Sequence, residues 1–421
     1  MTIWTPDLDS RQGPRYLAIA GALEHDIRQG HLTPGERLPT HRDLAYRLGV
    51  TVGTVSRAYA EAVRRNLVAG EVGRGTYVRG KDPQAQPVPT GDKTFFSITE
   101  DHDPSIIDFG LNLPIWDIEA PYLARTMKEI AEAPLLGALA RHQPASGRSA
   151  HRAAGAKWLA RTGLEVTPEQ VLISSGAQHG MMAALIAISR PGDLVLTESV
   201  TFPGIKALAA QLNLRLEGLE IDHEGILPDA FDRACRTLSP KALYCVPTHH
   251  NPTTATMSEE RRRDIAALAR HHGVFIIEDD VYGFLPEDRP PPLAAFAPEQ
   301  TFFVTGTSKS MTGGLRIGYI VPPASMVENV DSAIMGSIWF ASPLSAEIAS
   351  RWIMDGTTDE LIAWQRQELS ARHALVRKHL PESLLAAQPS SYHFWLNLPA
   401  PWRGVEFVNE LQRQGVTAIS S

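Results

Sequence analysis

Residues 304–319 read VTGTSKSMTGGLRIGY, and residues 276–284 upstream of them read IIEDDVYGF. Short apolar runs accompany both stretches and recur along the chain, and helical stretches such as residues 258–271 separate some of them. The runs are VLISS at 171–175, LVLTE at 194–198, ALYCVP at 242–247, VFIIED at 274–279 and TFFVT at 301–305. Apolar strands separated by amphipathic helices are typical of a largely parallel sheet covered on both faces. We therefore predict a three-layer α/β domain.

Lys309 and Asp279, one in each of these stretches, lie at or just beyond the end of a predicted strand. Open α/β sheets place ligands at that edge, and a lysine can be desolvated and made nucleophilic there. A primary amine and an anion that pairs with a pyridine nitrogen are two groups that pyridoxal phosphate (PLP) requires. Tyr282 can donate a hydrogen bond to the phenolate oxygen of the same ring. These residues predict a PLP site in which all three take catalytic roles.

A phosphate cradle and a stacking ring complete the requirements of PLP. The sequence SGAQ at residues 175–178 follows a strand and opens a helix, so its backbone N–H groups form an anion site. Arg316 offers a fork suited to phosphate, Asn251 can bond the phenolate oxygen, and Phe202 offers an aromatic face. Singly, each has another interpretation, such as Phe202 in the core or Asn251 in a turn. Their occurrence together and in order favours the PLP site.

Charge is distributed unevenly along the chain. Residues 1–80 contain eleven Arg and no Lys against eight acidic residues, a net +3, so the total of −7 leaves −10 for the remainder. A basic head on an acidic body suits a nucleic-acid contact through the head. No apolar run approaches the roughly 20 residues that cross a bilayer, and the N-terminus lacks a secretory signal pattern. Cys235 and Cys245 lack metal-ligand spacing, so we expect no metal site. Because the sequence shows neither a membrane span nor a secretory signal, we expect a cytoplasmic protein with no membrane partner.

The first eighty residues carry the pattern of a winged helix-turn-helix. Apolar residues at helical spacing over 16–27 predict a first helix that ends near residue 30. Thr40 caps a short second helix that Gly49 ends, and Thr51 caps a third that runs to about residue 66. The glycine-punctuated stretch VAGEVGRGTYV at 68–78 predicts a hairpin, the wing. Two short helices joined by a glycine turn lay the second in the major groove of double-stranded DNA.

Candidate DNA contacts lie at the start and exposed face of the third predicted helix, at the start of the second, and at the wing tip. Arginines there can pair with phosphates, and Arg57 could also bond guanine. For any single arginine the alternative is a solvated surface residue. The candidates are Thr51, Thr54, Ser56, Arg57, Arg42 and Arg74.

Residues 34–68, PGERLPTHRDLAYRLGVTVGTVSRAYAEAVRRNLV, resemble the GntR type of winged helix, and the likeness extends over nearly all of residues 14–79. The resemblance implies DNA contacts at the positions of Arg42, Thr51, Ser56 and the wing residue Gly75. The chain departs from that pattern at Val52 and Ser56, where family members often carry Arg or another long polar residue. The operator sequence is therefore not predictable.

Residues 105–421 resemble a fold type I aminotransferase, and with the GntR-like head the whole chain is similar to MocR-type regulators. The resemblance implies that Lys309 binds PLP covalently as an internal aldimine, that Asp279 pairs with the pyridine nitrogen, and that Phe202 stacks. Asn251 and Tyr282 would hold the phenolate oxygen. The implied phosphate ligands are Ser175, Gly176, Ala177, Gln178 and Arg316. A homodimer whose active sites borrow residues across the interface is also implied.

Several positions depart from the aminotransferase pattern. His142 stands where the family has a tyrosine that reaches the partner's phosphate, and it could still donate a hydrogen bond. Gly306 replaces a hydroxyl residue, so Thr307 or Ser308 would have to supply that phosphate contact. Thr254 replaces a glycine.

The chain stops at Ser421, before the strand that in relatives carries the arginine for a substrate carboxylate. Either the chain is truncated or another arginine serves; without a bidentate clamp, transamination is harder to expect than cofactor binding.

These observations predict residues 1–79 as a winged-helix domain, 80–104 as a linker and 105–421 as the PLP domain. The favoured function is a homodimeric, DNA-binding transcriptional regulator that senses PLP, an amino acid or a related amine. An active PLP-dependent aminotransferase with an accessory DNA-binding head is the alternative, so enzyme activity stays open. A third interpretation, an architectural DNA-binding protein with an empty body, would require a body that binds no PLP.

Overall fold

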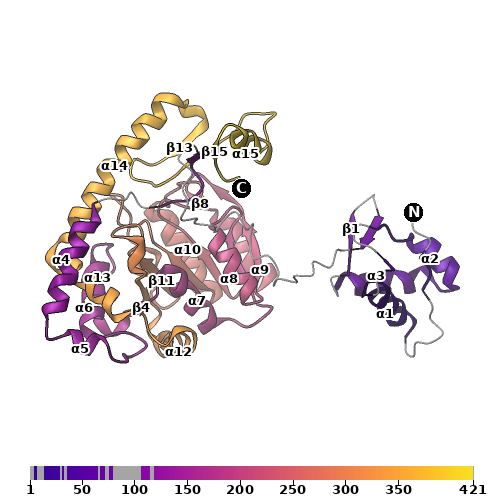
Figure 1. The fold of residues 1–421 in the computed structure, drawn as a ribbon, viewed down its shortest axis with the longest axis horizontal. Helices are drawn as coiled ribbons and strands as arrows, with labels where there is room; N and C mark the ends of the chain where they lie inside the picture. The colour runs from indigo at the N-terminus through magenta and orange to yellow at the C-terminus, as the bar shows by residue number, and fades with distance from the viewer. Residues whose placement is uncertain are drawn as a thin grey trace. The chain divides into compact units, whose positions relative to one another are not determined.

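The computed structural model describes residues 4–6, 14–28, 31–32, 36–64, 67–71, 75–78, 106–113 and 118–420. The chain forms two compact units, residues 1–89 and 90–421. They are coloured in sequence order in Figure 1. The predicted linker, residues 80–104, lies outside the described residues.

The N-terminal unit is a winged helix-turn-helix, as predicted. Its elements are α1 (Arg15–Arg28), α2 (His41–Leu48), α3 (Val52–Arg64), β1 (Val68–Glu71) and β2 (Gly75–Val78). The Thr40 side chain caps α2 by accepting from Asp43 N at 3.2 Å, and Gly49 ends that helix at φ 61°. Thr51 Oγ1 accepts from Thr54 N at 3.2 Å at the start of α3. Local hydrogen bonds therefore set the helix boundaries that the sequence indicates.

The body is built around a seven-stranded sheet of order β4-β12-β11-β10-β9-β5-β6. Strand β10 runs parallel to β9 and β11, whereas β12 runs antiparallel to both of its neighbours. The strands are β4 (Leu172–Ser174), β5 (Leu194–Glu198), β6 (Arg215–Leu219), β9 (Ala242–Cys245), β10 (Phe275–Asp279), β11 (Thr301–Gly306) and β12 (Gly318–Val321). The sheet is therefore mostly parallel.

Alternate residues of the sheet belong to different hydrophobic cores. Leu196 and Leu243 pack with residues of α9 (Pro228–Leu238) and α10 (Glu259–His272). Their neighbours Val195 and Tyr244 pack instead with α7 (Ala177–Ile188). Since successive side chains of a strand point to opposite faces, both faces of the sheet are covered by helices. This confirms the predicted three-layer α/β architecture.

Further helices and short strands complete the body. They are β3 (Ile107–Asp108), α4 (Glu119–Glu132), α5 (Leu136–Leu139), α6 (Ser149–Ala160), α8 (Pro203–Gln211), β7 (Ile221–Asp222), β8 (Gly225–Ile226), α11 (Leu293–Phe296), α12 (Val327–Ile338), α13 (Pro343–Asp355), α14 (Thr357–His379), β13 (Leu385–Ala387), β14 (Phe394–Leu396), α15 (Gly404–Arg413) and β15 (Val416–Thr417). Within the described residues, no helix is both long and apolar enough to cross a membrane.

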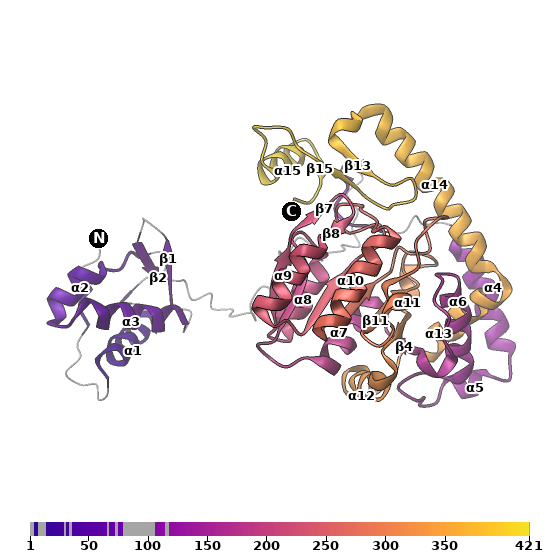
Figure 2. The same ribbon diagram turned by 180° about the vertical axis from the view of Figure 1, so that it is seen from behind.

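Residues 106–113, which we call the strap, lie beside the C-terminal end of the body. Strand β3 within the strap pairs in parallel with β15. Ile107 N donates to Gly415 O and Phe109 N donates to Thr417 O, both at 2.9 Å. Figure 2 shows β15 with α14 and α15 in the orange-to-yellow C-terminal part of the ribbon. The pairing brings together two segments about 300 residues apart in the sequence.

The sequence did not indicate two strands of the sheet, β6 and β12. Strand β6 lies at an edge of the sheet and most of its residues are not buried, so it lacks the continuous apolar run of a central strand. Strand β12 is fully buried but short, and it directly follows the glycine-rich turn that begins at Gly313.

Candidate functional site

Lys309 follows the end of β11 and is partly buried. Its Nζ donates to the backbone carbonyl of Asn112 in the strap, and it lies 5.4 Å and 6.0 Å from the ring centroids of Tyr392 and Tyr282. Burial lowers the pKa of Lys309 to about 8, with Asp279 opposing the shift and Arg316 adding to it. A lysine with this pKa carries an appreciable neutral fraction near neutral pH, and the neutral amine is the nucleophile.

Asp279 ends β10 and is buried. Its Oδ2 accepts from the hydroxyl of Tyr244 at 2.9 Å, whereas its Oδ1 is buried without a hydrogen-bond partner among the described residues. Burial, the largest cause, raises the pKa of Asp279 to about 7. An unsatisfied buried oxygen is costly, so it points to a donor that this chain itself does not supply. A protonated pyridine nitrogen is such a donor, and the site therefore fits PLP in this respect.

The first turn of α7 and Arg316 form a candidate anion site. Gly176 precedes α7 with φ 82°, and the first N–H groups of a helix have no acceptor within it. A Cβ on Gly176 would lie 2.7 Å from Nη2 of Arg316, so this backbone can approach the guanidinium because the residue is glycine. Nη1 of Arg316 donates to Oγ of Ser308 at 3.4 Å. Backbone donors and a guanidinium together suit a phosphate.

Some groups predicted for the phosphate are engaged within the chain. The N–H of Ser175 donates to Nδ1 of His179 at 3.1 Å, and Nε2 of Gln178 donates to Gly204 O at 3.1 Å. Of the two candidate hydroxyls, Thr307 Oγ1 donates to Ile317 O at 3.2 Å. Ser308 is therefore the hydroxyl that lies beside Arg316.

Of the predicted ring-binding residues, Asn251 lies next to Tyr282: its Nδ2 is 3.5 Å from the Tyr282 hydroxyl. Phe202 directly precedes α8, is half-buried and packs against the core of the sheet, with its ring close to Gly204. Thr254 has φ 64°, in the left-handed region that favours glycine, which accounts for the glycine usual at this position.

His142 lies in a different environment. It is exposed, and its ring centroid lies 5.6 Å from that of Trp339 and 5.9 Å from that of Phe340. This aromatic cluster contains none of the other residues predicted to hold the cofactor. A role of His142 at a phosphate would therefore require a second subunit.

Four residues of the site were not indicated by the sequence: Asn112, Tyr244, Tyr392 and His393. Asn112 Nδ2 lies 3.0 Å from the Tyr282 hydroxyl and 3.2 Å from Nδ1 of His393. Tyr392 donates to the backbone carbonyl of Lys309 at 2.9 Å. The sequence did contain a signal for Tyr244, because its hydroxyl is a polar group within the apolar run of β9 and would need a buried partner. The others carry no motif and depend on contacts distant in sequence.

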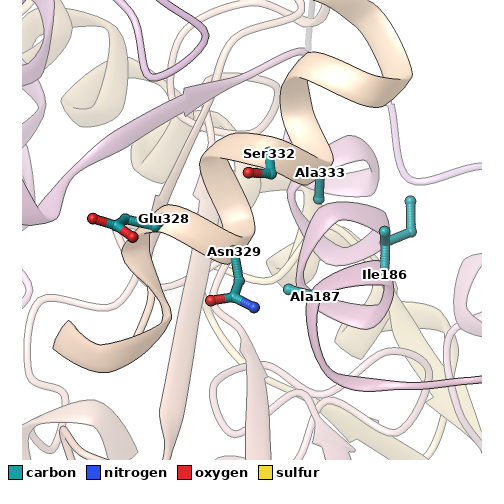
Figure 3. Close-up of a pocket in the computed structure, with 6 residues that line it drawn as sticks. All are labelled: Ile186, Ala187, Glu328, Asn329, Ser332 and Ala333. Atoms are coloured by element: carbon teal, nitrogen blue, oxygen red, sulfur yellow. The ribbon is translucent and has the colours of Figure 1, made fainter.

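A surface hollow lies where α7 meets α12. It is lined by Ile186, Ala187, Glu328, Asn329, Ser332 and Ala333 (Figure 3). None of these residues belongs to the Lys309 site. The hollow is therefore separate from the candidate cofactor site.

The N-terminal unit presents most of the predicted DNA contacts on exposed helix surfaces. Arg42 is exposed on α2, Thr51 precedes α3, and α3 carries Thr54, Ser56 and Arg57. The Arg57 guanidinium lies 4.3 Å from the centroid of the Tyr16 ring, beside a surface hollow that Arg15 and Thr54 also line. Gly75 begins β2, whereas Arg74 lies outside the described residues. Such a basic surface suits a DNA backbone.

Together, the two units define a DNA-binding regulator with an aminotransferase-like body. The chain belongs to the family of class I and II aminotransferases, whose model matches residues 105–420, and residues 15–78 match the gntR family of bacterial regulatory proteins. The family implies PLP as cofactor. The chain is a transcriptional regulator with an aminotransferase-like domain, as its relatives also indicate.

Two relatives and one solved structure illustrate the similarity of this chain to known proteins. The HTH-type regulator YdeF of Bacillus subtilis, itself uncharacterised, is 31% identical over 99% of this chain and 88% of its own length. The pyridoxine biosynthesis regulator PdxR of Corynebacterium glutamicum is 26% identical over 70% of this chain and 63% of its own. The kynurenine aminotransferase of Pyrococcus horikoshii has a TM-score of 0.68 at 21% identity, over 75% of this chain and 82% of its own. The last likeness concerns the fold.

Proposed function

We propose that this regulator binds PLP covalently through Lys309 and that PLP, an amino acid or a related amine alters its affinity for DNA. One observation carries the proposal: Asp279 Oδ1 is buried without a hydrogen-bond partner among the described residues. Burial also lowers the pKa of Lys309 to about 8, although the charge of Asp279 opposes that shift. An unpaired acceptor beside a reactive amine matches two separate requirements of PLP. The name of the PdxR relative, a regulator of pyridoxine biosynthesis, supports this class of effector.

Different residues of the site would hold different parts of the cofactor. Bound PLP supplies an aldehyde that forms a covalent bond with a primary amine. Asp279 would hold a proton on the pyridine nitrogen, and Tyr282 with Asn251 would hold the ring oxygen. Arg316 and the start of α7 would hold the phosphate, with Ser308 supporting Arg316.

The proposed function also assigns a role to each segment of the chain and to a homodimer. Residues 1–79 would bind a double-stranded operator, 80–104 would link the domains, and 105–421 would bind PLP in a cytoplasmic homodimer. Across that dimer His142 would donate to the partner's phosphate. An effector changes DNA affinity only if it binds one arrangement of the dimer better than another, and DNA must then change effector affinity equally.

Absorbance and gel shifts test the proposal. The purified chain titrated with PLP should become yellow, and borohydride should fix one label on the peptide that contains Lys309. DNA from upstream of its own and neighbouring genes should be shifted in a gel, and one member of a panel of amino acids and amines should change that shift. Colourless protein, or a label on another lysine, would contradict the PLP assignment. An unchanged shift with every panel member would contradict the effector role.

An active aminotransferase is the second candidate, and the lowered pKa of Lys309 favours it, because such an amine can exchange protons near neutral pH. An amino donor should then convert the cofactor spectrum to that of pyridoxamine phosphate, and a keto acid should restore it. A spectrum that changes on amine addition without this conversion supports the sensing function instead.

A further inference from the structure

Asn112 is the residue of the strap that enters the candidate site. Its backbone carbonyl accepts from Lys309 Nζ, and its side-chain amide meets both Tyr282 and His393. The strap is held elsewhere by β15 and by an edge contact of Phe109 with Phe394, with ring centroids 5.9 Å apart. One residue therefore connects the lysine, the tyrosine and the C-terminal segment.

The hydrogen bonds of His393 determine which of its ring nitrogens carries the proton. Nε2 lies 2.9 Å from the backbone carbonyl oxygen of His250, which can only accept, so Nε2 carries hydrogen. Burial lowers the pKa of His393 to about 4, so the ring is neutral and Nδ1 is an acceptor. Asn112 therefore donates one amide hydrogen to Nδ1, at 3.2 Å. This bond fixes the orientation of the Asn112 amide.

The fixed amide determines the direction of the Tyr282 hydroxyl. Asn112 donates its second amide hydrogen to the Tyr282 oxygen at 3.0 Å, and Asn251 donates to the same oxygen at 3.5 Å. Burial raises the pKa of Tyr282, so the hydroxyl keeps its proton. Since two donors already occupy the oxygen, that proton is left to donate to a third group. We propose that Asn112, oriented by His393, is a positioning residue that directs the Tyr282 proton to the ring oxygen of bound PLP.

This inference rests on the proposed PLP site, and the pH dependence of the bound cofactor tests it. The titratable groups that face Tyr282 are Lys309, Asp279, Tyr392 and His393. A hydrogen bond donated to the ring oxygen favours the high-pH form of the cofactor, in which that oxygen carries unshared negative charge. Weakening the bond should therefore raise the pH midpoint of the visible absorption change. For one hydrogen bond to a charged group the shift is about one pH unit.

The variants separate positioning from folding. Asn112→Ala should raise the midpoint by about one unit, and His393→Phe should raise it in the same direction by less. His393→Gln keeps both a donor and an acceptor and should keep the wild-type midpoint. The double variant Asn112→Ala/His393→Phe should match Asn112→Ala alone, because His393 acts through Asn112. Asn397→Ala is the matched control, since exposed Asn397 bonds Trp395 outside the site.

Where Asn112→Ala folds, two results would overturn the inference. One is a yellow Asn112→Ala protein with the wild-type melting temperature and midpoint, and the other is a double variant whose shift equals the sum of the single shifts. If Asn112→Ala does not fold, the pair His393→Phe and His393→Gln decides, because equal midpoints in both would also overturn it. A wild-type protein that PLP does not colour would instead refute the proposed PLP site itself.

Discussion

The two units of this chain place their charged groups in opposite environments. In the N-terminal unit Arg42 and Arg57 are exposed on helices. In the body Asp279 is buried, Lys309 is partly buried, and burial shifts the pKa of each toward neutrality. Exposed cations bind a polyanion with an affinity that salt reduces, whereas desolvated groups gain reactivity. Substitutions in one unit should therefore change measurements of that unit and leave those of the other unchanged.

The largest expected effect is that of Lys309→Ala. Removing the amine should abolish the visible absorption and the borohydride-stable label, since the covalent bond to PLP needs a primary amine. Lys206→Ala, at an exposed lysine of α8, is the control and should keep both. Absorbance and mass spectrometry measure the outcome. DNA binding without effector should persist in Lys309→Ala, and its loss would break the separation between the units.

Asp279→Ala should weaken PLP binding by about tenfold to a hundredfold, because a hydrogen bond to a charged group contributes about 1.5–3 kcal/mol. The dissociation constant from an absorbance titration measures this. Asp222→Asn is the control, since Asp222 pairs with Arg261 in a part of the body away from these contacts. An unchanged dissociation constant in Asp279→Ala would show that the buried oxygen does not meet the cofactor.

The pH dependence of PLP attachment to the apo-protein follows from the pKa of Lys309. That pKa is lowered to about 8, so the neutral amine predominates above pH 8 and the ammonium below it. Because only the neutral amine attacks, the initial rate should level off above about pH 8 and fall roughly tenfold per pH unit below it. Stopped-flow absorbance measures the rate. A rate still rising steeply at pH 10 would indicate an ordinary, unperturbed lysine.

The smallest expected effect is that of Arg57→Ala on operator binding. Loss of one phosphate contact should weaken binding severalfold and reduce the slope of log affinity against log salt by about one. Fluorescence anisotropy at several salt concentrations measures both, and Arg233→Ala, an exposed arginine of the body, is the control. The PLP absorbance of Arg57→Ala should match the wild type. A smaller affinity with an unchanged slope would indicate base contact rather than phosphate contact.

How much of the structure the sequence predicts depends on how far apart in the sequence the contacting residues lie. The caps at Thr40 and Thr51 are bonds between residues three apart, so the helices of the N-terminal unit could be read directly. Lys309 and Asp279 were predictable for a similar reason, since each lies near the end of an apolar strand. The residues that surround Lys309 and Asp279 in the site were not predictable in this way. Asn112 contacts His393 across 281 residues, and nothing local to either residue marks that pair.

The pairing of β3 with β15 has a mechanical consequence. Any tension applied to the body through the chain before Ile106 first meets the backbone bonds from Ile107 to Gly415 and from Phe109 to Thr417. Both bonds lie between the chain before Ile106 and Asn112, so a pull that leaves them intact would also leave the contact of Asn112 with Lys309 undisturbed.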